Sequence, residues 1–218
     1  MALFGKKNTI KKATNLSSEN IIKNPTVGSK ISRCMIINGP LKSCEPIIVE
    51  GKVNGQIECD DCVVITKGAF VSGKIFAKEV RIDGIVEAPI EADIVVISKS
   101  GLLTGYIIAT NVIIEGRSDG DILAKELLDV KKGAHVVTVE TEAQIVTIDG
   151  EISGTILASE IVDLKSAATV DGNIYVDDLQ RSKGATVLGS INRYNDFIDM
   201  EDKNSNIASV EYVVSTSS

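Results

Sequence analysis

The chain is poor in aromatic side chains and in histidine. It has no tryptophan, aromatic residues make up 4% of its 218 residues, and it contains one histidine and four prolines. Because aromatic side chains supply much of the volume of a thick globular core, their scarcity favours a thin core of branched aliphatic side chains, such as stacked strands provide. Hydrophobic residues still make up 44% of the chain, so a substantial core is expected.

Long apolar runs are also missing. No stretch approaches the ~20 apolar residues of a membrane-spanning helix, and no apolar segment follows the N-terminal lysines as in a signal peptide. We therefore expect a cytoplasmic protein whose four cysteines are reduced thiols. There is no Gly-x-x-x-x-Gly-Lys-Ser/Thr loop, and basic residues are not clustered with aromatics, so phosphate and nucleic-acid binding have little support.

What the sequence does contain is a repeated phrase close to Gly-x-Ile, which recurs nine times. Its anchors follow one another in steps of 15 to 18 residues: Ile57, Ile75, Ile90, Ile107, Ile122, Val139, Ile156, Ile174 and Ile191. Two residues before each anchor stand Gly55, Gly73, Ala88, Gly105, Gly120, Val137, Gly154, Gly172 and Gly189. A period of this length is typical of stacked repeat architectures.

Within each repeat, apolar and polar residues alternate, as in residues 69–75, which is the pattern of a strand with one buried face. The fold predicted is all-β: a single-stranded, right-handed parallel β-helix (β-solenoid) of about nine to ten coils with disordered termini. Coils about 4.8 Å apart would give a rod on the order of 45 Å long. The right-handed sense is favoured because coil lengths vary, whereas left-handed β-helices keep a six-residue repeat.

Charge divides the chain into three parts. Residues 1–24 carry five lysines against one glutamate and are predicted to form a flexible basic tail. Residues 25–194 are predicted to form the β-helix domain. Residues 195–218 carry five acidic residues against one lysine and are predicted to form a disordered acidic tail.

Cys59 and Cys62 form a Cys-x-x-Cys motif, which can bind zinc or exchange disulfides. In the repeat alignment, however, Cys59 falls in a column otherwise filled by alanine, and Cys62 in a column of valine and leucine. We therefore expect both side chains to point inward as small apolar groups. No metal ion and no cofactor are predicted.

His135 is the one histidine, and a hexapeptide-like acyltransferase would use it as a general base. It aligns with Phe70 and Thr186 in an outward column, with no acidic partner fixed near it in the sequence. The many acidic residues could serve a carbohydrate-active β-helix, but most of them lie beside glycines, where aspartate commonly forms turns. We expect a solvated histidine and no enzyme, with a β-helical acyltransferase or carbohydrate-active enzyme as the alternative.

The column directly after the anchors is unusually apolar for an outward position. It holds Phe76, Ile108, Leu123, Leu157 and Tyr175, together with Glu58, Glu91 and Glu140. Packing at a corner of the coil would explain these side chains, and so would lateral contact between rods. Both interpretations are open at this point.

The phrases at residues 49–57 (VEGKVNGQI) and 148–156 (IDGEISGTI) share the rhythm I-x-G-x-V-x-G-x-I. In this rhythm the chain resembles the bactofilins, the polymer-forming bacterial cytoskeletal family, over about residues 30–192. The resemblance implies a β-helix that stacks end to end into filaments without nucleotide. It further implies a scaffold that organises cell-shape or cell-envelope proteins.

The two ends of a solenoid expose unpaired strand edges and core side chains. We expect end-to-end association to bury Leu41, Ile47 and Ile48 at one end, and Val187, Ile191, Tyr194 and Phe197 at the other. The first seven residues (MALFGKK) are similar to the peptide that tethers many bactofilins to the inner membrane, which implies Leu3, Phe4, Lys6 and Lys7 as a tether. The expected partners are further copies of the chain, the inner-membrane surface, and cell-wall or partition proteins, but not nucleic acid.

Overall fold

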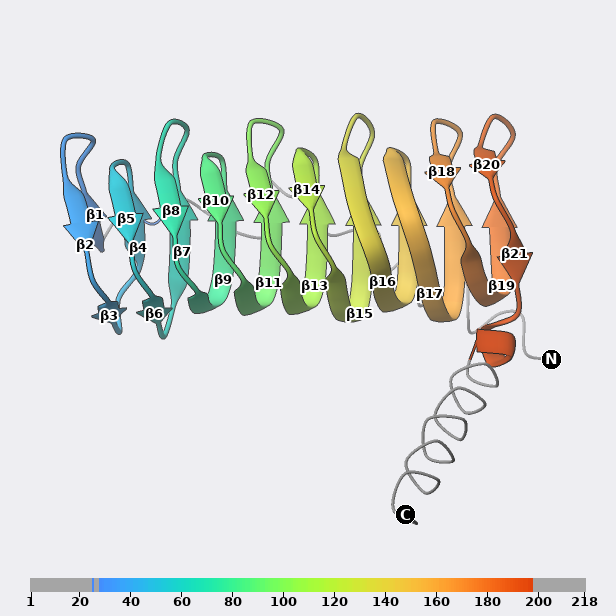
Figure 1. Cartoon of the computed structure of the whole chain (residues 1–218), viewed down its shortest axis with the longest axis horizontal. Coiled ribbons are helices and arrows are strands. Elements are labelled where there is room, and N and C mark those ends of the chain that lie inside the picture. The colour runs from blue at the N-terminus through green and yellow to red at the C-terminus, as the bar shows by residue number, and fades with distance from the viewer. Residues whose placement is uncertain (1–24, 26–27, 198–218) are drawn as a thin grey trace, which may run out of the picture.

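The computed structural model describes Pro25 and residues 28–197. The described chain winds into a β-solenoid of about 10 turns, whose coils stand side by side along one axis (Figure 1). Every pairing between described strands is parallel and joins one coil to the next. The prediction of an all-β parallel solenoid is therefore confirmed, while its right-handed sense stays a prediction.

Each coil contributes a strand or part of a strand to three walls. The first wall contains β2 (Ile36–Asn38), β5 (Lys52–Asn54), β8 (Phe70–Ser72), β10 (Ile85–Glu87), β12 (Leu102–Thr104), β14 (Arg117–Asp119), the first parts of β16 (His135–Ile148) and β17 (Glu151–Leu164), β18 (Thr169–Asp171) and β20 (Thr186–Leu188). The second wall contains β3 (Leu41–Ser43), β6 (Ile57–Cys59), the first parts of β9 (Ile75–Ile82), β11 (Ile90–Ile97), β13 (Ile107–Ile114), β15 (Ile122–Val130) and β19 (Ile174–Arg181), the middle of β16 and β17, and β21 (Ile191–Asn192). The third wall contains β1 (Ser29–Ile31), β4 (Ile47–Val49), β7 (Cys62–Ile65) and the last parts of β9, β11, β13, β15, β16, β17 and β19. After the last coil, residues 194–197 form a helical turn.

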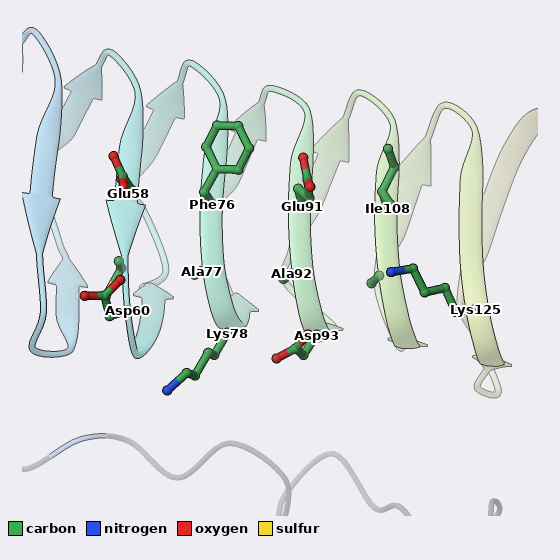
Figure 2. Close-up of a pocket in the computed structure, with 12 residues that line it drawn as sticks. Glu58, Asp60, Phe76, Ala77, Lys78, Glu91, Ala92, Asp93, Ile108 and Lys125 are labelled. Carbon is green, nitrogen blue, oxygen red and sulfur yellow. The ribbon is translucent and has the colours of Figure 1, made fainter.

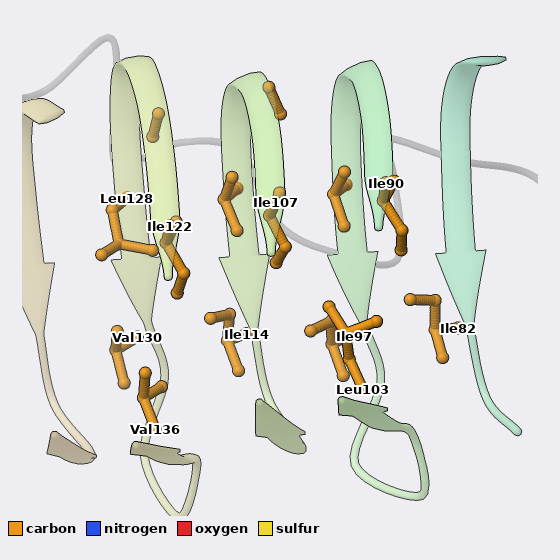
Figure 3. Packing of buried hydrophobic residues seen from close by; sticks show 14 of the residues in the cluster. Ile82, Ile90, Ile97, Leu103, Ile107, Ile114, Ile122, Leu128, Val130 and Val136 are labelled. Carbon is orange, nitrogen blue, oxygen red and sulfur yellow. The ribbon is translucent and has the colours of Figure 1, made fainter. Parts of the chain in front are cut away.

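The core is a set of parallel columns of aliphatic side chains, one position per coil (Figure 3). On the second wall the column follows the predicted anchors, and Ile57, Ile75 and Ile90 are fully buried. On the third wall the column includes Ile82 and Ile97. Branched side chains fit this core because successive coils place like residues directly over one another, at the ~4.8 Å spacing of paired strands.

Glycines stack at the corner between the first and second walls. Gly105 has a φ of +146°, and a Cβ built on it would lie 2.5 Å from the carbonyl oxygen of Ala88, one coil earlier. The same relation to the preceding coil recurs at Gly55, Gly73, Gly120, Gly154, Gly172 and Gly189. The corner therefore requires glycine for two reasons, its backbone angle and the close approach of the neighbouring carbonyl.

One predicted anchor is wrong. Val139 is 80% exposed, and Thr141 takes its place in the column, pairing with Ile122 on one side and Ile156 on the other. This coil carries one extra residue at the corner, because three residues separate Val137 from Thr141 where two separate Ser153 from Ile156, and the side chain of Asp121 accommodates it. Its Oδ1 accepts hydrogen bonds from the backbone N–H groups of Val139 (3.0 Å) and Glu140 (3.1 Å), and these bonds lower the pKa of Asp121.

The two cysteines of the Cys-x-x-Cys motif differ in orientation. Cys59 is buried and belongs to the core cluster, as predicted. Cys62 is also buried, but it pairs with Glu79 next to Val63, and Val63 occupies the core column. Because side chains alternate along a strand, Cys62 points away from the core, so its predicted inward orientation is wrong.

The glycine corner gives a test of what holds the coils together. We expect Gly105→Ala to lower the free energy of unfolding by about 2 kcal/mol more than Gly39→Ala, because a Cβ at position 105 collides with a carbonyl. Gly39 has a comparable φ of +139° but no atom within 4 Å of its Cβ position, so it controls for the backbone angle alone. Urea unfolding of the two variants measures the difference, and equal losses would contradict the steric role of the corner.

A second prediction concerns Ser118, a polar residue in the core column of the first wall. It lies between Leu103 and Val136, is fully buried, and its Oγ has no hydrogen-bond partner among the described residues. Replacing it with valine removes an unsatisfied polar group and fills the column, so Ser118→Val should raise the free energy of unfolding by about 1 kcal/mol. Ser153→Val, at an outward position of the same wall two coils further on, is the control, and a lower urea midpoint for Ser118→Val would refute the prediction.

Candidate assembly surfaces at the ends of the coil

The N-terminal end of the rod presents three strands that are paired on one side only. Within the described chain, β1, β2 and β3 pair with β4, β5 and β6 respectively, and no strand lies on their other side. Two inward side chains of this first coil, Ile37 and Leu41, pack against the core but are only partly buried. The end therefore offers both open backbone edges and apolar surface to another chain.

The C-terminal end has the same character. β20 and β21 pair only with β18 and β19 among the described strands. Ile191 is 47% exposed, whereas Ile174, which occupies the same column one coil earlier, is fully buried. The exposure of Ile191 therefore arises because the column ends there.

The predicted end residues are placed unevenly. Leu41 and Ile48 are half-buried in the first coils, but Ile47 is 3% exposed and lies between Ser29 and Val63 within the third wall. At the other end the half-buried residues are Val187, Tyr194 and Phe197. The Phe197 ring packs edge-on against Tyr175, with ring centroids 5.1 Å apart, so the helical turn packs on the outward side of the second wall, against the coil before the last.

Three exposed apolar side chains at the ends escaped the sequence reasoning. Met35 is 46% exposed, Ile36 63% and Leu188 58%. The repeat alignment places Ile36 and Leu188 in outward columns, where a polar residue is expected. Ile36 and Leu188 lie in the first and last strands of the first wall. An apolar residue in an outward column was the signal that could have identified them as end residues.

The outward column of the second wall mixes apolar and acidic side chains. Phe76 lies between Glu58 and Glu91, and Figure 2 shows these side chains with Ile108 along one shallow groove. The Lys74 ammonium lies 4.1 Å from the centre of the Phe76 ring and 3.3 Å from Glu91. Because Thr141 pairs with Ile122, Glu142 and not Glu140 lies in this column beside Leu123.

Of the other apolar residues of this column, Leu123 is 39% exposed and Leu157 3%. Ile108 and Tyr175 are half-buried. The side chains of this column are therefore partly covered by their own neighbours along the wall, and the charged residues between them break the apolar surface into short stretches.

The residues considered for catalysis or metal binding lie apart from one another. His135 is in the outward column with Phe70 and Thr186, as predicted, and its Nδ1 lies 3.1 Å from Oε2 of Glu151, one coil on. His135 therefore has an acidic partner after all. The stacking of the coils brings Glu151 beside it, although the two residues are not close in the sequence. Burial raises the pKa of the Cys59 thiol, and raises that of Cys62 to about 11, so neither is poised as a thiolate.

Among the described residues, no group of three or more His, Cys, Asp or Glu side chains could hold a metal ion. No helix in the described part of the chain is long and apolar enough to cross a membrane. The predicted tether residues Leu3, Phe4, Lys6 and Lys7 lie outside the described residues, as does the predicted acidic tail from residue 198 onward.

Comparison with known proteins gives one match. A family model described as "Bactofilin: Polymer-forming cytoskeletal" matches residues 29–115, 76–138 and 107–192, which together span the coils. No curated protein and no solved structure matches the chain at the level of significance required.

Proposed function

Because the chain belongs to the bactofilin family, a polymer-forming cytoskeletal family, we propose that it self-assembles end to end into filaments without nucleotide and acts as a scaffold at the cell envelope. The observation that carries the proposal is the state of the two ends. Both ends leave strand edges unpaired within the described chain and core side chains partly exposed.

End-to-end contact would continue the interactions that already join the coils. Parallel pairing at each free edge would supply the missing backbone hydrogen bonds, and the columns ending at Leu41 and Ile191 would each gain an apolar neighbour. Both gains come from burial and backbone pairing, so assembly of this kind requires no nucleotide. Gly39 leaves the glycine corner open at the N-terminal end, with no atom within 4 Å of its Cβ position.

Association with the inner membrane is a separate part of the proposal. Leu3 and Phe4 provide little apolar area, and each nearby lysine adds about 1 kcal/mol of attraction to an anionic surface. A single copy would bind weakly, but the many copies along a filament would bind together through avidity. Membrane attachment would thus depend on assembly, and it would hold a scaffold for cell-wall or partition proteins at the membrane.

The alternative, a β-helical enzyme, rests on His135. Its partner Glu151 is a solvent-exposed residue of the neighbouring coil, and the pair lies on the outward side of the first wall. A general base of this kind would need a cleft that positions a substrate beside it. The proposed function is accordingly structural and gives His135 no catalytic role.

The end contacts are tested by placing a charge where burial is expected. Ile191→Lys should abolish filaments seen by electron microscopy in nucleotide-free protein, because a lysine would be desolvated at the interface. Phe197→Arg should act in the same way, with the added loss of its contact with Tyr175. Val139→Lys is the control, since Val139 is 80% exposed on the side of the rod. Circular dichroism establishes that all three variants remain folded, and filaments in both end variants would refute the assignment.

The tether is tested by deleting residues 2–7. Flotation with anionic lipid vesicles should show a large loss of binding for assembled protein, with filaments of normal appearance by electron microscopy. Vesicles of neutral phosphatidylcholine serve as the control for charge. Undiminished flotation of the deletion variant would show that this peptide is not the tether.

A further inference from the structure

Seven apolar side chains of the third wall are buried, although they point away from the core. Val112 and Ile114 belong to the core cluster, whereas Ile113 between them faces outward and is still fully buried. Its outward neighbours along the wall are similarly covered: Cys62 6%, Val64 2%, Val96 1%, Leu127 2%, Ile145 7% and Ile161 4% exposed. Several of these residues form two small clusters separate from the core. We refer to this outward surface as the third-wall face.

The other two walls show what an uncovered position looks like. Ile85, outward on the first wall, and Leu123, outward on the second wall, are each 39% exposed. They are flanked by parallel strands in the same way as Ile113 and Leu127. At these two positions the flanking strands leave more than a third of the side chain exposed. Leu157, on the second wall, is 3% exposed, but it lies beside Tyr175, against which Phe197 packs. The burial of seven apolar side chains on the third-wall face therefore points to a further covering segment.

Polar groups on this face are buried too. Asp129 is 2% exposed and Asp163 6%, and each is paired with a lysine two residues on, at 2.6 Å. Burial raises the pKa of Asp129 in spite of its ion pair with Lys131. Between the two aspartates, the buried Oγ1 of Thr147 has no hydrogen-bond partner among the described residues. A buried hydroxyl normally has a partner, so a covering segment with free backbone groups would suit it.

The described strands do not provide the cover. All of them belong to the walls of the coil, and the helical turn at residues 194–197 contacts Tyr175 on the second wall. We propose that residues 10–24 of the same chain dock along the third-wall face. This proposal goes beyond filament assembly and does not depend on it.

The position and length of this segment fit the face. The described chain enters the coil at β1, the first strand of the third wall, so the preceding residues start at one edge of the face. Ten strands about 4.8 Å apart span roughly 43 Å, which an extended chain rising about 3.3 Å per residue crosses in about 13 residues. Residues 10–24 are sufficient, and residues 1–9 would then extend past the far end of the rod, free to contact a membrane.

The composition of the segment also fits. Ile10, Leu16 and Ile22 are six residues apart, so an extended chain would present all three on the same side. Residues 1–24 have a net charge of +4, from five lysines and one glutamate. Residues 25–194 have a net charge of −7, since the whole chain is −7 and the last 24 residues carry −4. Apolar contact and opposite charge therefore act together.

Cys62 provides a probe that the chain already contains. In the full-length protein, Leu16→Asp with Ile22→Asp should undock the segment and raise the rate of Cys62 alkylation by iodoacetamide at least about tenfold, because the thiol becomes accessible. Cys59, which faces the core, should keep its slow rate, and the exposed Cys34 and Cys44 should react fast throughout. Peptide mass spectrometry follows each cysteine separately.

The matched control is Asn15→Asp with Ser17→Asp, which adds the same charge on the opposite side of an extended segment. It should leave the alkylation rate of Cys62 close to that of the unmodified chain. The proposal is overturned if Cys62 reacts no faster in the Leu16/Ile22 variant, or equally fast in the control.

A photo-crosslinking amino acid at position 16 identifies the occupant of the face directly. With a mixture of isotope-labelled and unlabelled full-length protein, products within one chain, to residues 127–130 or 145–148, support the proposal. Products that join labelled to unlabelled chains at these strands assign the face to a second copy and overturn it. Products that miss the third wall also overturn it.

Discussion

The close approach of one coil to the next at the glycine corner is the constraint on which the rest of the structure depends. At Gly105 the carbonyl of the preceding coil occupies the space that a side chain would need. Glycine there allows successive coils to approach to the spacing that their backbone hydrogen bonds set, and this spacing keeps like residues in columns. The aliphatic columns then form a core without large aromatic side chains, so the scarcity of aromatics and the frequency of glycine have a common physical origin.

Regular spacing is what the sequence could reveal, and it identified the solenoid, the corner glycines and most core positions. Prediction of core positions from regular spacing was wrong at a corner where the spacing is irregular and a side chain stabilises the irregular backbone. Asp121 binds the backbone N–H groups of Val139 and Glu140 at a corner with one extra residue, and the column position falls on Thr141, a polar residue that no hydrophobic pattern selects. Cys62 was misplaced by one position, because the connection between the second and third walls varies in length, and a shift of one residue reverses the side of the strand.

The candidate assembly site was predictable in location but not in detail. That the ends of the stack are unfinished follows from any solenoid, and Ile191 is exposed for this reason. The residues exposed at the N-terminal end depend, however, on the wall in which the first coil begins. The coil begins with β1 in the third wall, and β1 pairs with the strand of Ile47, so Ile47 is not at the end. The cover of the third-wall face was likewise beyond sequence reasoning, because alternation predicts which side chains point outward but not which of the three walls remains exposed.

One extra residue within Thr138–Glu140 distinguishes this coil from the other described coils. A wall that repeats at every coil offers a ligand many near-equivalent positions, and binding there would have no defined stoichiometry. The protruding corner, with Val139 at its tip, occurs once in the described coils and on one side of the rod. In a polymer of this chain it would recur once per subunit, at an interval equal to the subunit length. The same irregularity that interrupts the repeat would therefore let other molecules be spaced along a filament at a fixed, molecularly defined distance.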